Sequence, residues 1–114
     1  MEQRRTRRFR LELPLSITRT GAVRVTLSGR TKNISSTGVL FTAGREPDLG
    51  GSIEYIITLH RESTHPVLIR CVGKVVRAEP TIGGTTDEER RSYDIAVTLE
   101  RYEFVREAGR QAVG

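Results

Sequence analysis

Two short segments hold the side chains best suited to chemistry, and the first of them is the N-terminus. Five of its first ten residues are arginines, namely Arg4, Arg5, Arg7, Arg8 and Arg10. Against the single acid Glu2, these arginines supply +4 of the formal net charge of +5. Such a segment predicts an anionic partner, which could be nucleic acid, a phosphorylated ligand or a membrane surface. A solvated tail with no specific partner is the alternative interpretation.

The second segment is Asn33-Ile34-Ser35-Ser36-Thr37-Gly38, which has the spacing Asn-x-Ser-x-x-Gly. An amide and a hydroxyl can both donate and accept hydrogen bonds to a polar ligand. A glycine permits a positive φ or the close approach of a ligand. The same residue types also form plain turns capped by their own side chains, so a turn without ligand is the alternative.

Other polar residues do not form a recognisable active site. His60 and His65 flank a polar turn with no cysteine near them, so they are expected to be exposed and not zinc ligands. Glu88 and Glu89 lie in a charged loop, and Asp94 has no evident partner base or nucleophile. The chain contains no GxxxxGK[ST] phosphate loop and no GxGxxG after a strand. We therefore expect neither an enzyme nor a metal or cofactor site.

The cysteine count and the hydropathy pattern indicate the cellular compartment in which the protein is expected. Cys71 is the single cysteine, so an internal disulfide is impossible, and its apolar surroundings predict a buried, inert thiol. No apolar run approaches the roughly 18 residues of a membrane helix. The basic N-terminus is not followed by the apolar stretch of a secretory signal. The expected compartment is the cytoplasm.

The elements that must position these residues are mainly strands, because apolar residues alternate with a period of two. Pro14 predicts an edge position or a bulge in the first strand, and Thr20-Gly21 predicts a hairpin after it. The apolar phase slips near Gly73, which is a candidate bulge. The six expected strands cover about 9–17, 23–28, 39–42, 53–59, 67–79 and 93–99.

Six short alternating strands predict an all-β fold, either a small antiparallel barrel or a sandwich. The last residues change to a helical spacing, with Tyr102 and Val105 on one face, so we expect a short helix over about 101–112. The segment 80–91 is expected to be a mobile loop. The predicted organisation is a flexible arginine-rich segment, 1–10, and a single domain, 9–114.

The sequence resembles the PilZ domain family over nearly its whole length. The resemblance includes the spacing Arg4-x-x-x-Arg8 before the first strand and Asn33-x-Ser35-x-x-Gly38 between the second and third. It also includes three longer stretches: Arg8-Phe9-Arg10-Leu11-Glu12-Leu13-Pro14, Cys71-Val72-Gly73-Lys74-Val75-Val76-Arg77 and Tyr93-Asp94-Ile95-Ala96-Val97. The resemblance implies a six-stranded, split antiparallel β-barrel with a C-terminal helix, and a bacterial receptor for cyclic di-GMP.

By this resemblance, Arg4 and Arg8 are the motif arginines and Arg5 is a helper. Their guanidinium groups suit phosphate oxygens and guanine O6 and N7, and they can stack on a base. Asn33, Ser35 and Gly38 form the second wall of the site. The family more often has aspartate at the position of Asn33, so the asparagine is expected to bind less tightly.

One further departure is Ala96, which stands where many relatives have glycine and could narrow the site or only change packing. Since nothing in the chain supplies output chemistry, an unidentified downstream protein is implied as a partner. Two other functions stay open. One is a PilZ-like interaction domain that does not bind the ligand. The other is a basic barrel that binds nucleic acid, which the small share of aromatic residues, 5%, disfavours.

Overall fold

The computed structural model describes residues 11–59, 66–84 and 86–106. These residues form seven strands and one short helix, α1 (Asp87–Arg90). The strands are β1 (Pro14–Thr20), β2 (Val23–Ile34), β3 (Gly38–Ala43), β4 (Ser52–Leu59), β5 (Val67–Pro80), β6 (Tyr93–Thr98) and β7 (Arg101–Arg106).

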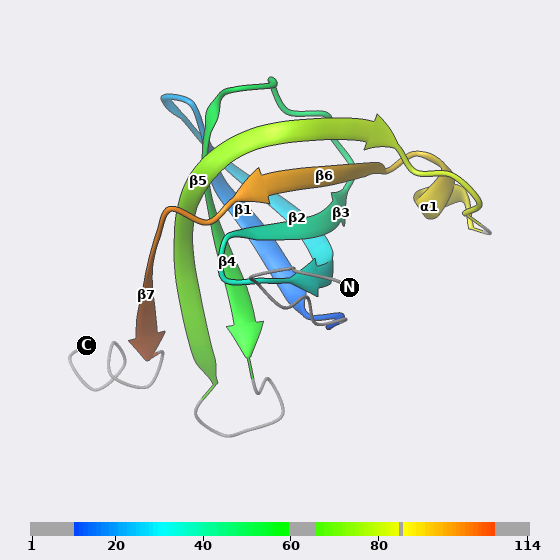
Figure 1. The fold of residues 1–114 in the computed structure, drawn as a ribbon. Helices are drawn as coiled ribbons and strands as arrows, with labels where there is room; N and C mark the ends of the chain where they lie inside the picture. Colours follow the sequence, from blue (N-terminus) through cyan, green and yellow to red (C-terminus); the bar gives the residue numbers. More distant parts are fainter. Residues whose placement is uncertain (1–10, 60–65, 85, 107–114) are drawn as a thin grey trace, which may run out of the picture.

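The strands form one antiparallel sheet in the order β4-β1-β2-β3-β6-β5-β7, and β4 also pairs with β5. That additional pairing closes β1 to β6 into a six-stranded barrel. The long, curved β5 pairs with β6 along its second half and with β7 along its first half (Figure 1). The predicted all-β, six-stranded antiparallel barrel is therefore confirmed.

The alternation in each strand explains which side chains fill the barrel. Successive side chains of a strand point to opposite faces, so every second residue of β3 and β4 is buried. Phe41 and Tyr55 are the largest fully buried side chains, and their ring centroids lie 6.1 Å apart. The remaining buried apolar residues are Leu15, Ile17, Val39, Ala43, Ile53, Ile57, Cys71, Val75, Ile95 and Val97.

The predicted first hairpin is present, but its strands cover 14–20 and 23–34 where about 9–17 and 23–28 were expected. β1 begins at Pro14, which pairs with Arg30, so the proline occupies the first position of its strand, where it needs no ladder donor. Thr20 pairs with Val23, which leaves Gly21 and Ala22 as the turn. Gly21 has a φ of +60°, a conformation that glycine adopts without steric penalty.

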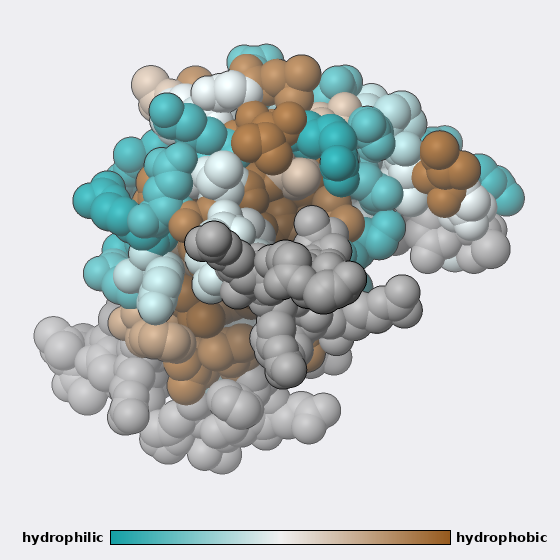
Figure 2. Space-filling view, viewed as in Figure 1, coloured by the Kyte–Doolittle hydropathy of each residue, from teal (hydrophilic) through white to brown (hydrophobic). Residues whose placement is uncertain are grey.

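The predicted C-terminal helix is wrong over Arg101–Arg106, which form β7, and its remainder, 107–112, lies outside the described residues. β7 pairs with β5 from Val67↔Arg106 to Val72↔Arg101. Its Tyr102 and Phe104 are 60% and 63% exposed, so these aromatics do not face a core. On the face of the molecule drawn in Figure 2, exposed hydrophobic residues lie beside hydrophilic ones. The segment expected to be a loop, 80–91, contains the single turn α1.

Gly73 is not the bulge, because its pairing with Ile53 lies in an unbroken register between β4 and β5. The bulge lies between Val75 and Arg77, where the pairing with β6 shifts. Gly73 instead permits the close approach of another backbone segment: a Cβ built there would lie 1.8 Å from the Thr98 carbonyl oxygen. The chain passes from β6 to β7 at this point.

Candidate functional site: the outer face of β2, β3, β6 and β5

The turn that joins β2 to β3 is organised by Ser35. The Ser35 amide donates to the Gly38 carbonyl at 2.9 Å, which closes the turn. The Ser35 hydroxyl accepts from the amides of Thr37 and Gly38 at 3.2 and 3.1 Å. Ser35 therefore caps its own turn and fixes the end of the β2–β3 hairpin, as the plain-turn interpretation expected.

Gly38 is required by the barrel's own backbone. Of the two roles expected for this glycine, a positive φ does not apply, because its φ is not among the positive values. A Cβ on Gly38 would lie 2.9 Å from the Val97 carbonyl oxygen of β6. The close approach that the glycine permits is thus made by β6, which pairs Thr98 with Gly38.

Asn33 lies on the outer face because of a bulge in β2. Thr31 pairs with the buried Phe41, whereas Asn33 pairs with Leu40, so Lys32 is an extra residue in the ladder. Without this residue, positions 31 and 33 would face the same side. The bulge turns Thr31 inward and Asn33 outward. No other side chain in the described part of the chain makes a hydrogen bond to the Asn33 amide group.

A cross-strand row extends from Asn33 over four strands. Asn33 pairs with Leu40, Leu40 with Ala96, and Ala96 with Arg77. The second bulge, in β5, separates the buried Val75 from the outward Arg77 in the same way as the first. The Arg77 side chain is 57% exposed, and its closest carboxylate, that of Glu79, is 4.0 Å away.

Arg77 and Leu40 were not among the predicted site residues. The available indication for Arg77 was the slip in apolar phase along β5, which places an arginine on the face opposite Val75. Ala96 does lie on this face, between Leu40 and Arg77, and is partly exposed. A methyl group there stands directly in the row that begins at Asn33.

The polar surface beside this row is partly neutralised. Lys32 Nζ lies 3.3 Å from Oδ2 of Asp94. The other carboxylate oxygen of Asp94, Oδ1, accepts a hydrogen bond from the Thr81 hydroxyl at 2.9 Å. A shallow hollow of about 290 Å³ adjoins these residues, and Arg30, Lys32 and Thr42 contribute to its lining. Asp94 therefore acts as an ion-pair partner on the outer face.

Residues 11–13 connect the N-terminal segment to the candidate site on β2. The Thr31 amide donates to the Leu13 carbonyl at 2.9 Å, so this segment lies against β2 two residues before Asn33. The predicted ligand-binding residues Arg4, Arg5 and Arg8 lie outside the described residues, as do Arg7 and Arg10. Within the described part, the candidate site thus comprises the predicted residues Asn33, Ser35 and Gly38 and the row that continues to Arg77.

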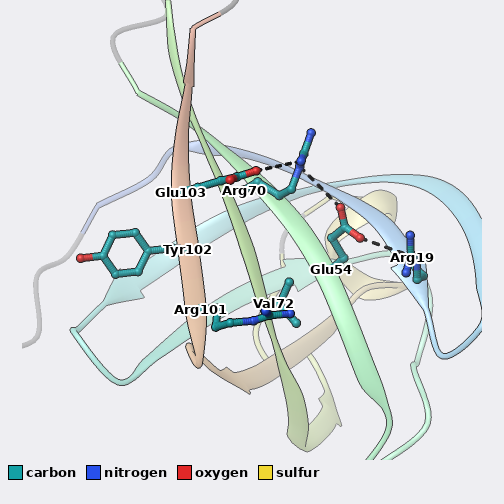
Figure 3. Close-up of a pocket in the computed structure, with 7 residues that line it drawn as sticks. All are labelled: Arg19, Glu54, Arg70, Val72, Arg101, Tyr102 and Glu103. Atoms are coloured by element: carbon teal, nitrogen blue, oxygen red, sulfur yellow. Dashed lines mark hydrogen bonds and ion pairs between the residues drawn. The ribbon is translucent and has the colours of Figure 1, made fainter.

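A larger hollow, of about 400 Å³, lies on different strands, among β1, β4, β5 and β7 (Figure 3). Glu54 lies 3.6 Å from both Arg19 and Arg70, and Arg70 lies 2.8 Å from Glu103. Tyr102 points away from these ion pairs. The carboxylates of Glu54 and Glu103 therefore offset the charges of Arg19 and Arg70, and Arg101 adds a third arginine to the lining.

Two buried groups have strongly shifted acidities but take no part in the site. Burial raises the pKa of Cys71 from 9.0 to about 12. Burial, with smaller contributions from Cys71 and Glu100, raises the pKa of Tyr55 as well. The Tyr55 hydroxyl donates to the Thr98 carbonyl at 3.2 Å. Both groups therefore stay protonated in the folded protein at neutral pH.

Within residues 11–59, 66–84 and 86–106, no three His, Cys, Asp or Glu side chains gather closely enough to hold a metal ion. His60 and His65 lie outside them. No helix in the same ranges has the length and apolar character needed to cross a membrane.

The fold is a small closed β-barrel with an apolar core, and the candidate site lies on the outer face of β2, β3, β6 and β5. The family model for the PilZ domain matches residues 2–99 of the 114, so the chain belongs to the PilZ domain family. PilZ domains are binding and adaptor modules, and the family is one of cyclic di-GMP receptors. Searches of curated proteins and of solved structures returned no match.

Proposed function

We propose that this chain is a cyclic di-GMP receptor that couples ligand binding to a change in conformation or in its contact with a downstream protein. The N-terminal arginines Arg4, Arg5 and Arg8 bind phosphate and guanine groups, because a guanidinium group donates two parallel hydrogen bonds to either. The second wall is the β2–β3 hairpin with Asn33, Ser35 and Gly38.

The observation that carries this proposal is the placement of Asn33. Its carboxamide lies on the outer face without a hydrogen-bond partner among the described side chains, beside the segment 11–13 that follows the arginines. A carboxamide can accept from guanine N1 or N2 and can also donate. Ser35 and Gly38 support this role by holding the hairpin end in one conformation.

The row from Asn33 to Arg77 extends the proposed binding face. Adjacent strands lie about 4.8 Å apart, so the row spans roughly 14 Å between its ends. That length is comparable to a flat dinucleotide, and Arg77 brings a guanidinium group to the far end. Leu40 and Ala96 between them offer an apolar floor that a base can cover.

Calorimetric titration with cyclic di-GMP tests the proposal. The wild-type chain is expected to bind, and Arg8→Ala is expected to bind roughly 10- to 150-fold more weakly, because charge-assisted hydrogen bonds are lost. Arg45→Ala is the charge-matched control, since Arg45 follows the opposite end of β3, and it should bind like the wild type. Absence of heat and of any shift in Tm for the wild-type chain would refute the proposal.

A further inference from the structure

Thr31 is the single buried polar residue among those the structure describes, with an exposed fraction of 0%. It faces the barrel interior opposite Phe41. Burying a hydroxyl among apolar groups is unfavourable unless both its donor and its acceptor capacity are used. The hydrogen-bond partners of this hydroxyl therefore indicate which segment of the chain it positions.

Both partners belong to the segment that precedes β1. The Thr31 hydroxyl accepts from the Leu13 amide at 2.8 Å and donates to the Leu11 carbonyl. The β1–β2 register begins at Pro14↔Arg30, so residues 11–13 are not held by regular strand pairing. Thr31 holds them instead, through its own amide and its side chain.

The same bulge that turns Asn33 outward turns Thr31 inward, so the two halves of the proposed site meet at these positions of β2. Only two residues, 9 and 10, separate Arg8 from Leu11. Three residue steps of chain span at most about 11 Å, which limits how far Arg8 can lie from the tethered carbonyl. The hydroxyl thus restricts where the arginine segment can go relative to Asn33.

We propose that Thr31 is a positioning residue for cyclic di-GMP binding, which holds the base of the arginine segment against β2 before the ligand arrives. This inference rests on the proposed function. Without the tether, residues 11–13 must be ordered at the moment of binding, and each newly ordered backbone residue weakens affinity by roughly 5- to 30-fold.

The test compares Thr31→Val, which keeps the shape but removes the hydroxyl, with Thr31→Ser, which keeps both hydrogen bonds. We expect Thr31→Val to bind cyclic di-GMP at least about tenfold more weakly, and Thr31→Ser to bind within about twofold of the wild type. Ile57→Val, in the core of β4, is the stability control: it lowers Tm but should leave affinity unchanged.

A double-mutant cycle separates positioning from a purely structural role. If Thr31 acts through the arginines, the combined Thr31→Val and Arg8→Ala variant loses less affinity than the product of the two single losses. Independent losses, or wild-type affinity in Thr31→Val, overturn this inference while leaving the proposed function intact. No binding by the wild-type chain overturns both together.

Should Thr31→Val fail to fold, hydrogen exchange on the wild-type protein decides the question. A tether that exists before binding protects the Leu13 amide in the absence of ligand, because that amide is bonded to a buried hydroxyl. Fast exchange at Leu13 without ligand, followed by slow exchange with it, would show that the ligand and not Thr31 orders the segment, and would overturn the inference.

Discussion

Asn33 carries an amide at a position where the family more often has the carboxylate of aspartate. A carboxamide offers one acceptor oxygen and a donor, whereas a carboxylate offers two acceptors and a charge. If the group accepts from guanine, Asn33→Asp tightens binding of cyclic di-GMP a few-fold, and Asn33→Ala weakens it about tenfold. Titration calorimetry measures both. Thr58→Ala, a polar truncation on β4, should change nothing, and an unaltered affinity in Asn33→Ala would remove Asn33 from the site.

Cys71 gives a pH dependence of stability with a defined sign. Burial raises its pKa from 9.0 to about 12, so above pH 9 the unfolded thiol ionises while the folded one does not. The unfolded state then binds fewer protons, and the free energy of unfolding falls as pH rises, by about 1.4 kcal/mol per unit.

Urea unfolding of wild type and Cys71→Ala at pH 8 and pH 10 tests this dependence. Over that interval the wild type should lose about 1.4 kcal/mol more than the variant, which has no thiol to ionise. Burial, the larger cause of the raised pKa of Tyr55, acts in both proteins, so the contribution of Tyr55 largely cancels in the comparison. Equal losses would contradict the buried, protonated thiol, as would rapid reaction of native Cys71 with a thiol reagent at pH 8.

At the scale of the element, the junction of β5, β6 and β7 depends on Gly73. A methyl group there would lie 1.8 Å from the Thr98 carbonyl, and backbone cannot move aside as a flexible side chain can. We expect Gly73→Ala to lower the free energy of unfolding by about 3 kcal/mol or more, or to prevent folding.

Gly44→Ala is the matched control for this prediction. A Cβ on Gly44 meets nothing within 4 Å, and its φ is not positive, so the change should stay within about 0.5 kcal/mol. Urea unfolding monitored by circular dichroism measures both variants. Similar stability in the two would mean that the Thr98 carbonyl does not lie against the backbone at Gly73.

The elements that the sequence predicted well are those with one buried face. β3 and β4 alternate strictly, since every second residue enters the core, and their positions were predicted within one residue or two. β7 was missed because residues 101–104 are all exposed, so no buried face imposes a period of two. Tyr102 and Val105 then satisfied a helical spacing by chance. A strand that pairs only through its backbone leaves little trace in side-chain pattern.

The site shows the same limit. The motif Asn33-x-Ser35-x-x-Gly38 could be read directly, but the face on which Asn33 lies could not, because a single extra residue in β2 reverses it. Arg77 depends on a second such bulge in β5. Thr31 looked like an ordinary strand residue, and only its contacts with Leu11 and Leu13 show that it holds residues 11–13 against β2.

For the whole molecule, the distribution of charge is compatible with both a dinucleotide receptor and a nucleic-acid-binding barrel. Most of the net positive charge lies in the first ten residues, and the rest of the chain is nearly neutral. Exposed aromatics also exist on β7, at Tyr102 and Phe104, so stacking platforms are not absent. The two functions therefore have to be separated by how binding responds to salt.

Polymeric nucleic acid carries condensed counterions, which bound arginines release, whereas a cyclic dinucleotide with two phosphates has no such atmosphere. If five arginines engage a single strand, a tenfold rise in salt lowers affinity by roughly three orders of magnitude. For cyclic di-GMP, where ordinary screening operates alone, we expect a loss of less than about tenfold. Titrations at 50 and 500 mM NaCl, with cyclic di-GMP and with a 20-nucleotide single strand, measure both slopes. Tighter binding of the oligonucleotide at both salt concentrations would favour the nucleic-acid function and count against the receptor.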